Sequence, residues 1–311
     1  MKIVAVEPIG ITSVRAEEIK NKFMSLGHEF IYYSDRKEDD SSLIERMHEA
    51  DIVIISNIPL NTNILSECKK LKMLSIAFTG LDHIDLDYCK NHNITVCNAS
   101  GYATTAVCEL TIGLMLDVYR HITFLDIQTR KLQTRNNFLG RQIAGKTVGI
   151  LGTGAIGTSV ALALQKLGCH IIAWNRSQNQ ELIDNNIPYF SLEELLSISD
   201  IISIHLPLTE ETFHLLDKSK LELCKNNAIL INTARGNIID VYALAGILSN
   251  GKLAGAGIDV FETEPPLPKN HPLLKAPNCV IVPHIGYATH EAFEHRIEIV
   301  LDNIFQWLQN N

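Results

Sequence analysis

The sequence lacks the features that mark a membrane protein, a secreted protein or a nucleic-acid-binding protein. No apolar stretch approaches the roughly 18 residues that a membrane-spanning helix needs. The N-terminal run Met1–Val6 meets charged residues too early for a signal peptide. Its 27 basic residues are outnumbered by 35 acidic ones, which gives a net charge of −8, and they form no long cluster. We therefore expect neither a membrane nor a nucleic acid as a partner.

Paired cysteines are also lacking. The seven cysteines are an odd number and include no Cys-x-x-Cys motif. This pattern predicts reduced thiols in a cytoplasmic protein, without disulfides or a zinc site. Internal repeats and low-complexity segments are absent as well, so we expect ordinary globular domains.

The length and the order of apolar segments predict two domains. A chain of 311 residues is long for one hydrophobic core. Short apolar strands alternate with amphipathic segments in two series, which indicates two doubly wound parallel sheets of the α/β class. The expected strands are 3–6, 30–33, 52–56, 73–77 and 94–97, then 148–151, 171–174, 201–205, 228–232, 255–259 and 280–282.

Two long helices are expected to connect these domains. One spans about 105–125, and its apolar residues on all sides predict a buried helix. The other is C-terminal, begins after Thr289 as N-cap with Glu291 in its first turn, and has apolar residues at helical spacing. It is expected to return to the first domain.

A glycine turn follows the first strand of the second series. Gly152, Gly154 and Gly157 form a GxGxxG motif between an apolar strand and a predicted helix at 159–167. The first glycine permits the tight turn, the second lets the backbone approach phosphate, and the third packs the helix on the strand. The helix N-terminus adds unpaired N–H groups for an anion. The motif predicts a dinucleotide-binding domain in mid-chain.

Three charged or titratable side chains follow other strands of this second series. Arg235, Asp259 and His284 each lie at the end of a strand, at the edge where open α/β sheets bind ligands. Hydride transfer to a carbonyl carbon leaves charge on its oxygen, and a histidine near neutrality is a suitable proton donor. Glu264 is a candidate carboxylate partner for it, and the Arg235 guanidinium suits a substrate carboxylate.

Seven ordered motifs resemble the D-isomer-specific 2-hydroxyacid dehydrogenases, including the glyoxylate and hydroxypyruvate reductases among them. Together they are far more specific than any one alone. They are Thr79-Gly-Leu-Asp-His-Ile-Asp85; Asn98 to Thr104 with Ala106-Val-Cys-Glu109; Gly145 to Gly157; Ser199 to Thr209; Ile231-Asn-Thr-Ala-Arg-Gly236; Gly257-Ile-Asp-Val-Phe261; and Val282-Pro-His-Ile-Gly286.

The resemblance implies roles for these residues. Arg235 would bind the substrate and polarise its carbonyl, His284 would be the general acid/base, and Glu264 would orient it. Asp259 matches the nicotinamide-side carboxylate of the family. The backbone of the turn Phe78, Thr79 and Gly80 would bind the substrate carboxylate. Cofactor contacts are expected at Thr104, Gly152, Gly154, Ala155, Ile156, Gly157, Asn175, Arg176, Ser177, His205, Pro207, Thr212, Thr233, Ala234, Asp259, His284 and Gly286.

The resemblance also implies an architecture. A flavodoxin-like substrate domain would comprise residues 1–99 plus 287–311, and a Rossmann NAD(P)-binding domain residues 100–286. A homodimer through the cofactor domain and the absence of a metal are further expectations of the family.

Asn175 stands where the family usually has an acidic residue for the adenosine ribose. An acid there would bind the ribose 2′-hydroxyl and repel a 2′-phosphate. Asn175 removes that repulsion, and Arg176 with Ser177 would bind the phosphate. The substitution favours NADP(H); the alternative is that Arg176 is solvated and both cofactors bind.

Two other departures concern the substrate. Tyr287 replaces a common serine beside His284, where it either shapes the pocket mouth or only packs. The turn 56–60 lacks the arginine with which phosphoglycerate-oxidising relatives bind phosphate, which argues against a phosphorylated substrate. Formate-oxidising relatives lack the His–Glu pair, so its presence disfavours formate.

The sequence therefore predicts an NAD(P)-dependent reductase of small 2-oxo acids, such as glyoxylate, hydroxypyruvate or pyruvate. It leaves open which acid is used and in which direction. The alternatives are a nicotinamide-sensing binding protein related to corepressors, and a different Rossmann enzyme such as an amino-acid dehydrogenase. Arg235, Glu264 and His284, in that order, argue against the second alternative.

Overall fold

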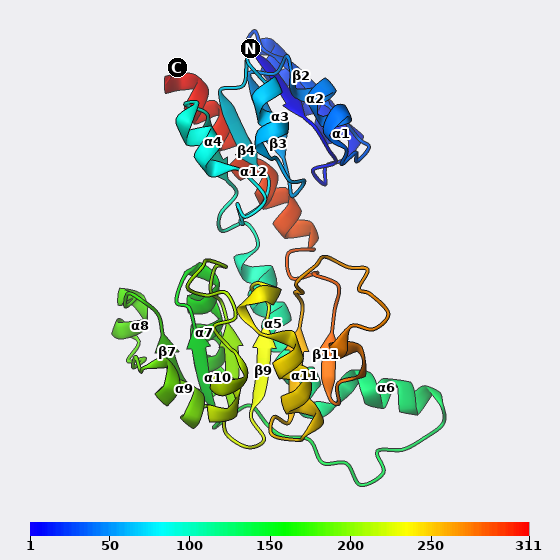
Figure 1. The fold of residues 1–311 in the computed structure, drawn as a ribbon, viewed down its shortest axis with the longest axis vertical. Helices are drawn as coiled ribbons and strands as arrows, with labels where there is room; N and C mark the ends of the chain where they lie inside the picture. The colour runs from blue at the N-terminus through cyan, green and yellow to red at the C-terminus, as the bar shows by residue number, and fades with distance from the viewer. Residues whose placement is uncertain (311) are drawn as a thin grey trace. The chain divides into compact units, whose positions relative to one another are not determined.

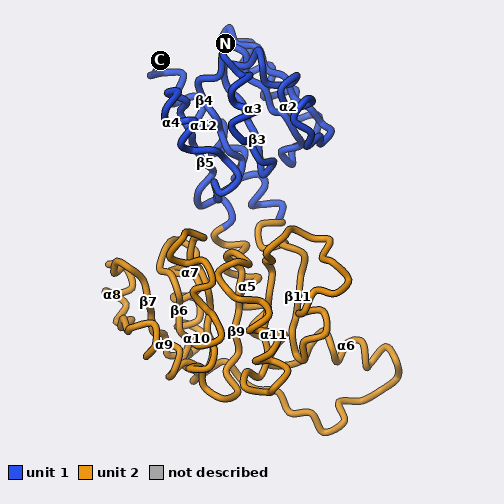
Figure 2. The backbone as a smooth tube through the Cα atoms, viewed as in Figure 1, with its two compact units in different colours: residues 1–103, 289–311 blue, residues 104–288 orange. Residues whose placement is uncertain are grey.

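The computed structural model describes residues 1–310, and the chain divides into two compact α/β units (Figure 1, Figure 2). The first unit contains residues 1–103 and the chain from residue 289 onward. The second contains residues 104–288. Both sheets are wholly parallel, which confirms the predicted fold class.

The first unit is built on a five-stranded sheet in the order β2-β1-β3-β4-β5, the flavodoxin-like order. Its ligand-binding switch point lies where β1 and β3 are neighbours. The strands are β1 Lys2–Ala5, β2 Glu29–Tyr32, β3 Ile52–Ile55, β4 Met73–Ile76 and β5 Thr95–Asn98. The helices of this part of the chain are α1 Ser13–Ser25, α2 Asp40–Met47, α3 Thr62–Glu67, α4 Leu86–Asn91 and α12 His290–Asn310.

Local sequence explains where these helices begin. The side chains of Thr12, Asp39, Asn61 and Asp85 each accept a backbone N–H in the first turn of the helix that follows. The Thr289 hydroxyl does the same for α12 by accepting Ala292 N at 3.1 Å, as the sequence predicts.

Helix α12 packs on the first sheet, far from its neighbours in sequence. The hydroxyl of Ser75 in β4 donates to Val300 O at 3.4 Å, and Asn303 Nδ2 donates to Asn98 O at 3.0 Å. The apolar face with Val300 and Ile304 is wholly buried. The C-terminal helix therefore completes the first unit.

The second unit has a six-stranded sheet in the order β11-β10-β9-β8-β6-β7. Its switch point lies between β6 and β8. Strand β7 pairs with β6 on one side, and β8, the next strand in the chain, pairs with β6 on the other. The strands are β6 Thr147–Leu151, β7 His170–Trp174, β8 Ile201–Ile204, β9 Ile229–Asn232, β10 Gly255–Ile258 and β11 Cys279–Ile281. The helices are α5 Thr104–Arg120, α6 Ile122–Arg130, α7 Ala155–Lys166, α8 Gln180–Asp184, α9 Leu192–Ile198, α10 Lys218–Leu223 and α11 Val241–Ser249, with short 3-10 turns η1 Gly236–Ile238 and η2 Pro272–Lys275.

The expectation of one buried helix at 105–125 is wrong. The chain leaves the helix at His121, whose φ of 52° is left-handed, and α6 begins after it. Helix α5 buries Leu114, Met115 and Val118 in the core, whereas α6 buries none of its residues. An apolar sequence continues through the break, but within residues 1–310 its second half has no core to pack on.

All eleven expected strands occur, with ends shifted by at most one residue. Within the described residues no helix is long and apolar enough to cross a membrane. The seven cysteines are free thiols, and burial raises the pKa of Cys224 to about 11 and that of Cys279 to about 12. Residues 1–310 contain no group of three or more His, Cys, Asp or Glu side chains that could hold a metal ion.

Candidate active site

The glycine turn lies between β6 and α7 and has the geometry that a pyrophosphate requires. Gly152 has a φ of +95°, and a Cβ there would lie 2.5 Å from His205 O. A Cβ on Gly157 would lie 1.9 Å from Gly152 O, so only glycine fits between helix and strand. At Gly154, by contrast, a Cβ would meet no atom within 4 Å. The backbone is thus closed on the protein side and open at the helix N-terminus, which fits a dinucleotide phosphate.

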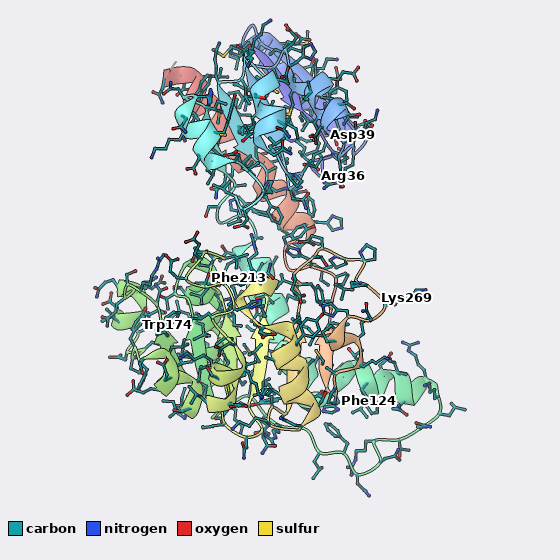
Figure 3. The ribbon with its side chains drawn as sticks, viewed as in Figure 1. Arg36, Asp39, Phe124, Trp174, Phe213 and Lys269 are labelled. Carbon is teal, nitrogen blue, oxygen red and sulfur yellow. The ribbon has the colours of Figure 1, made fainter. Side chains whose placement is uncertain are left out.

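The residues after β7 form the loop expected at the adenosine ribose, and Trp174 marks the end of the strand (Figure 3). Asn175 Nδ2 donates to Ser177 O at 2.9 Å, so this side chain orders the loop. Arg176 is exposed and forms no ion pair within the described residues. The pKa of Glu211 is lowered first by the Thr209 hydroxyl and the backbone, and also by the positive charge of Arg176. The ribose loop therefore lies near the loop that follows β8.

Two polar residues that the sequence analysis did not identify attach this loop to the glycine turn. Asn179 Nδ2 donates to Thr153 O and Thr158 Oγ1, both at 3.1 Å. The Tyr189 hydroxyl accepts Asn179 N at 2.9 Å and donates to Thr153 Oγ1 at 3.1 Å. Asn179 has a sequence signal, because it is the N-cap of α8. Tyr189 has none, since only the fold brings it here.

His205, Pro207 and Thr212 come from the segment after β8. Ser203 Oγ lies 2.8 Å from His205 Nε2, while the buried Nδ1 has no partner within the described residues. Burial lowers the pKa of His205 to about 3, so the ring is neutral at physiological pH. The Thr212 hydroxyl donates to Pro207 O at 2.7 Å and shapes the loop.

Arg235 is placed by a turn after β9 that a buried asparagine organises. Asn232, 1% exposed, donates to Arg235 O at 2.9 Å and accepts Ala234 N at 3.0 Å. A Cβ on Gly236 would lie 2.0 Å from the carbonyl carbon of Phe261, so this position requires glycine. The Thr233 hydroxyl lies 2.9 Å from that of Thr111 in α5. The turn is therefore held from both sides.

Asp259 joins the ends of β10 and β11. It is 1% exposed, and its two carboxylate oxygens accept Ile285 N at 2.7 Å and Gly286 N at 2.9 Å. Burial raises the pKa of Asp259, while these two hydrogen bonds and the nearby His284 act in the opposite direction. A Cβ on Gly286 would lie 2.9 Å from Asp259 Oδ2. The carboxylate thus fixes the loop that carries His284.

His284 follows β11 and is paired with Glu264. Its Nδ1 lies 2.8 Å and 3.0 Å from the two Glu264 oxygens. Its φ of +54° is uncommon for a residue with a side chain and persists where the surroundings hold it. The Tyr287 ring meets the imidazole edge to face, with centroids 5.5 Å apart. With Nδ1 held by the carboxylate, Nε2 is the nitrogen that would exchange a proton with a ligand.

Most of the expected site residues follow strands of the second sheet and therefore share its carboxyl edge. Thr104 begins α5 in the same unit. Phe78, Thr79 and Gly80 instead follow β4 in the first unit. There Phe78 O accepts Ala99 N at 3.0 Å and Thr79 O accepts Asn98 Nδ2 at 2.7 Å. The carbonyls of Phe78 and Thr79 are thus engaged, whereas the N–H groups of Thr79 and Gly80 donate to no acceptor within the described residues.

Comparison with known proteins matches residues 112–286 to the family described as D-isomer specific 2-hydroxyacid dehydrogenase, NAD binding domain. A glyoxylate reductase of Thermococcus litoralis is 39% identical over 272 residues, 84% of this chain and 82% of the relative. A hydroxypyruvate reductase of Thermotoga maritima is 37% identical over 88% of this chain and 90% of its own. The solved structure of an acyclic imino acid reductase (Bsp5) with NADPH and D-Arg superimposes with a TM-score of 0.90 at 29% identity, over 100% of this chain and 98% of the other.

These similarities extend over both units, and the matched family region contains the glycine turn, Arg235, Glu264 and His284. They confirm the resemblance that the seven motifs carry. The chain belongs to the D-isomer specific 2-hydroxyacid dehydrogenases and is an NAD(P)-dependent enzyme of that family.

Proposed function

We propose that the protein reduces small 2-oxo acids of the glyoxylate and hydroxypyruvate class to the D-2-hydroxy acids. The observation that carries the proposal is the His284–Glu264 pair, with Nδ1 2.8 Å from the carboxylate, on the same sheet edge as the glycine turn. An oriented histidine beside a dinucleotide site suits proton transfer to a carbonyl oxygen. The names of the two curated relatives support the same substrate class.

Each residue has a distinct task in this proposal. The nicotinamide, when bound, supplies the hydride. Arg235 binds the substrate and stabilises negative charge on its carbonyl oxygen. His284 donates its Nε2 proton to that oxygen, which becomes the hydroxyl, and is then reprotonated from solvent. Glu264 accepts Nδ1–H and so fixes the ring orientation that leaves Nε2 to face the substrate.

In the same proposal residues 1–99 plus 287–311 form the substrate domain, and residues 100–286 bind the cofactor. The N–H groups of Thr79 and Gly80 bind the substrate carboxylate, which is supported by their lack of an acceptor within the described residues. Two neighbouring backbone N–H donors suit a carboxylate.

We further propose NADP(H) as the preferred cofactor. The amide of Asn175 brings no negative charge to the ribose loop, and its hydrogen bond to Ser177 O keeps the loop folded. Arg176 is exposed at the same turn, where its guanidinium can pair with a 2′-phosphate. Glu211 opposes this preference, because its negative charge lies close enough to interact with the positive charge of Arg176.

A cytoplasmic homodimer completes the proposal. Helix α6 and the chain after it expose large apolar side chains, with Phe124 at 55% (Figure 3) and Leu132 at 95%. Such a surface is unfavourable in a monomer and suits an interface within the cofactor domain. Seven free thiols suit a reducing compartment. Sedimentation of the wild type and of Phe124→Glu tests the interface, and a monomeric wild type would contradict it.

The first experiment mixes the purified protein with glyoxylate, hydroxypyruvate and pyruvate, with NADPH or NADH, and follows the loss of reduced-nicotinamide absorbance. We expect turnover with a preference for NADPH. Cofactor binding without turnover of any 2-oxo acid would contradict the reductase function and favour a nicotinamide-sensing protein.

A further inference from the structure

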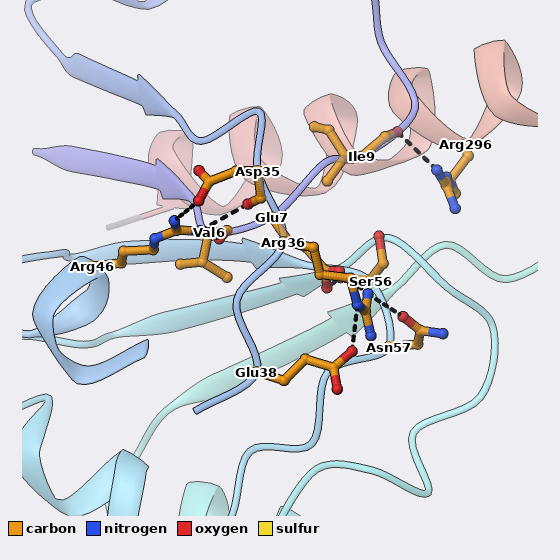
Figure 4. Close-up of polar contacts among 10 residues, drawn as sticks. All are labelled: Val6, Glu7, Ile9, Asp35, Arg36, Glu38, Arg46, Ser56, Asn57 and Arg296. Atoms are coloured by element: carbon orange, nitrogen blue, oxygen red, sulfur yellow. Dashed lines mark hydrogen bonds and ion pairs between the residues drawn. The ribbon is translucent and has the colours of Figure 1, made fainter. Parts of the chain in front are cut away.

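The buried carboxylate at the edge of the first sheet has a partner for each of its oxygens (Figure 4). Glu7 is 1% exposed; its Oε1 accepts Ser56 N at 2.7 Å, and its Oε2 is paired with Arg36 Nη1. Arg36 also donates to Asn57 Oδ1 at 2.9 Å and to Glu38 at 2.7 Å. These contacts join the segments after β1, β2 and β3, so a structural task accounts for the buried charge.

A second carboxylate that the proposed chemistry does not use, Glu262, is paired with a buried histidine of the second unit. His271 is 7% exposed, and its Nε2 lies 3.2 Å from Glu262 Oε2. An ionised carboxylate only accepts hydrogen bonds, so Nε2–H is the donor. The buried Nδ1 has no hydrogen-bond partner. Within the described residues, Glu262 therefore supplies the only hydrogen bond to this ring.

The Glu262–His271 pair closes a loop that contains Glu264. Its two residues are nine positions apart and lie between the end of β10 and the start of η2. The backbone of His271 is fixed as well, because its N–H donates to Pro268 O at 2.9 Å and its carbonyl accepts Leu274 N at 3.1 Å. Glu264 thus belongs to a loop whose two ends are joined by side chains and anchored by backbone hydrogen bonds.

The same pair is packed against the turn that carries Arg235. The Phe261 ring meets the His271 imidazole edge to face, with centroids 5.6 Å apart. The backbone of Phe261 lies so close to Gly236 that a Cβ there would be 2.0 Å from the Phe261 carbonyl carbon. Gly236 directly follows Arg235. The joined ends of the loop are therefore fixed relative to the Arg235 turn.

Glu264 itself is not held by burial. Its side chain is 66% exposed, and its carboxylate oxygens lie 2.8 Å and 3.0 Å from His284 Nδ1. Pro265 follows it, and the residue before a proline is restricted toward extended backbone conformations. Only Thr263 lies between this restrained residue and Glu262. The position of the Glu264 carboxylate therefore depends on where Glu262 is held.

We infer that Glu262 and His271 are positioning residues that hold Glu264 at Nδ1 of His284. They act through the loop that they close and have no contact with the substrate in this mechanism. The inference rests on the proposed function and deepens it, because it names what keeps the proposed proton donor oriented. Without the pair, Glu264 would contact Nδ1 for a smaller fraction of the time, and Nε2 would be directed less often at the substrate oxygen.

Variants that keep or remove the hydrogen bond of the pair test this role. Glu262→Gln keeps an acceptor for Nε2–H and should leave kcat for glyoxylate within about twofold of the wild type. Glu262→Met and His271→Phe each remove one partner at similar side-chain size, so kcat should fall about 3- to 10-fold, the worth of one hydrogen bond. The affinity for NADPH, measured by fluorescence titration, should not change. The matched control Glu193→Met breaks a surface ion pair with Lys220 in the same unit and should leave kcat unchanged.

The decisive readout is the coupling to Glu264, which a merely structural role would not produce. In a Glu264→Ala background no carboxylate is left to position, so adding Glu262→Met should lower kcat by less than about twofold. An equal further loss in both backgrounds would overturn the inference, as would full kcat in Glu262→Met alone. Either result would leave the reductase function standing.

Two further outcomes are also decisive. If His271→Phe does not fold, Glu262→Met decides the matter, because the Glu262 side chain is partly exposed, at 28%, and its replacement buries no charge. A wild type that turns over none of the 2-oxo acids would contradict the proposed function, and the inference would fall with it.

Discussion

The two sheets of this protein end in edges of different construction. At the edge of the second sheet each group with a proposed function lies in a short motif after its own strand, as with Arg235 after β9 and His284 after β11. At the edge of the first, Glu7, Arg36 and Asn57 come from three strand ends and are joined by hydrogen bonds and ion pairs. The first kind of site can be recognised in sequence. The second kind exists only when the strands are assembled.

Replacing His284 should break the second edge without disturbing the first, and it has the largest expected effect. His284→Ala removes the proposed proton donor, so kcat should fall about 10²- to 10⁴-fold. Cofactor affinity should remain nearly unchanged, measured by fluorescence titration with NADPH. The exposed His48 is the control, and His48→Ala should leave kcat alone. Turnover of His284→Ala near the wild-type level would remove His284 from its role.

Replacing Arg46 should destabilise the protein at the first edge. Arg46→Met leaves the carbonyls of Val6 and Asp35 without their donor in a buried place, and we expect a loss of about 2–4 kcal/mol in the free energy of unfolding by urea. Arg15 is the matched control, because it pairs with Glu18 and Glu298 on the surface. Arg15→Met should cost less than about 1 kcal/mol. Equal losses of unfolding free energy in the two variants would mean that the buried hydrogen bonds of Arg46 contribute no more stability than a surface ion pair.

His205 makes the second edge sensitive to acid. Its pKa is about 3 in the folded protein, below the ordinary value near 6.5, so the unfolded chain takes up the proton first. Stability must then fall as pH falls from about 6.5 toward 3. Between pH 6.5 and 5 this residue should cost about 2 kcal/mol.

Substitution His205→Gln should remove that part of the pH dependence. Urea unfolding of both proteins at several pH values measures it as the difference between the two curves. The comparison is needed because Asp259, with its pKa raised by burial, contributes stability with the opposite sign as pH falls. If the free energy of unfolding depended on pH equally in the wild type and the variant, burial would not lower the pKa of His205.

Asn175→Asp tests the end of β7 at the second edge, and its expected effect is the smallest. A carboxylate at the end of β7 would accept the ribose 2′-hydroxyl and repel a 2′-phosphate. We expect the NADPH-to-NADH ratio of kcat/KM to fall about tenfold or more. The control Asn91→Asp adds the same charge to an exposed helix end of the first unit. An unchanged ratio in Asn175→Asp would mean that this position does not contact the ribose.

Strands were predictable because both sheets are parallel and covered on both faces, so their strands are short apolar runs such as Ile52–Ile55. The break at His121 was not. Apolar residues continue from α5 into α6, and their periodicity does not show that Ile122 and Phe124 stay exposed within the described residues. A left-handed residue between two helical segments leaves no clear mark in the sequence.

The residues of the proposed second-sheet site could be grouped from the sequence, because each lies at or after a strand end and parallel strands end at one edge. The contacts that support them could not be predicted. Tyr189 reaches Thr153 across 36 positions, and Asn232 organises the Arg235 turn through its side chain. Spacing in the sequence carries no information about such contacts, since they depend on how the strands are ordered.

By itself the sequence determined the family, the two parallel sheets and the motif residues. It did so because glycine turns, buried strands and strand-end charges are local requirements of backbone and chemistry. Only the tertiary structure decided that His284 contacts Glu264 through Nδ1, that α6 buries none of its residues within the described part of the chain, and that Arg36 donates to Asn57. These are relations between segments far apart in the chain, and sheet order and side-chain packing alone bring them together.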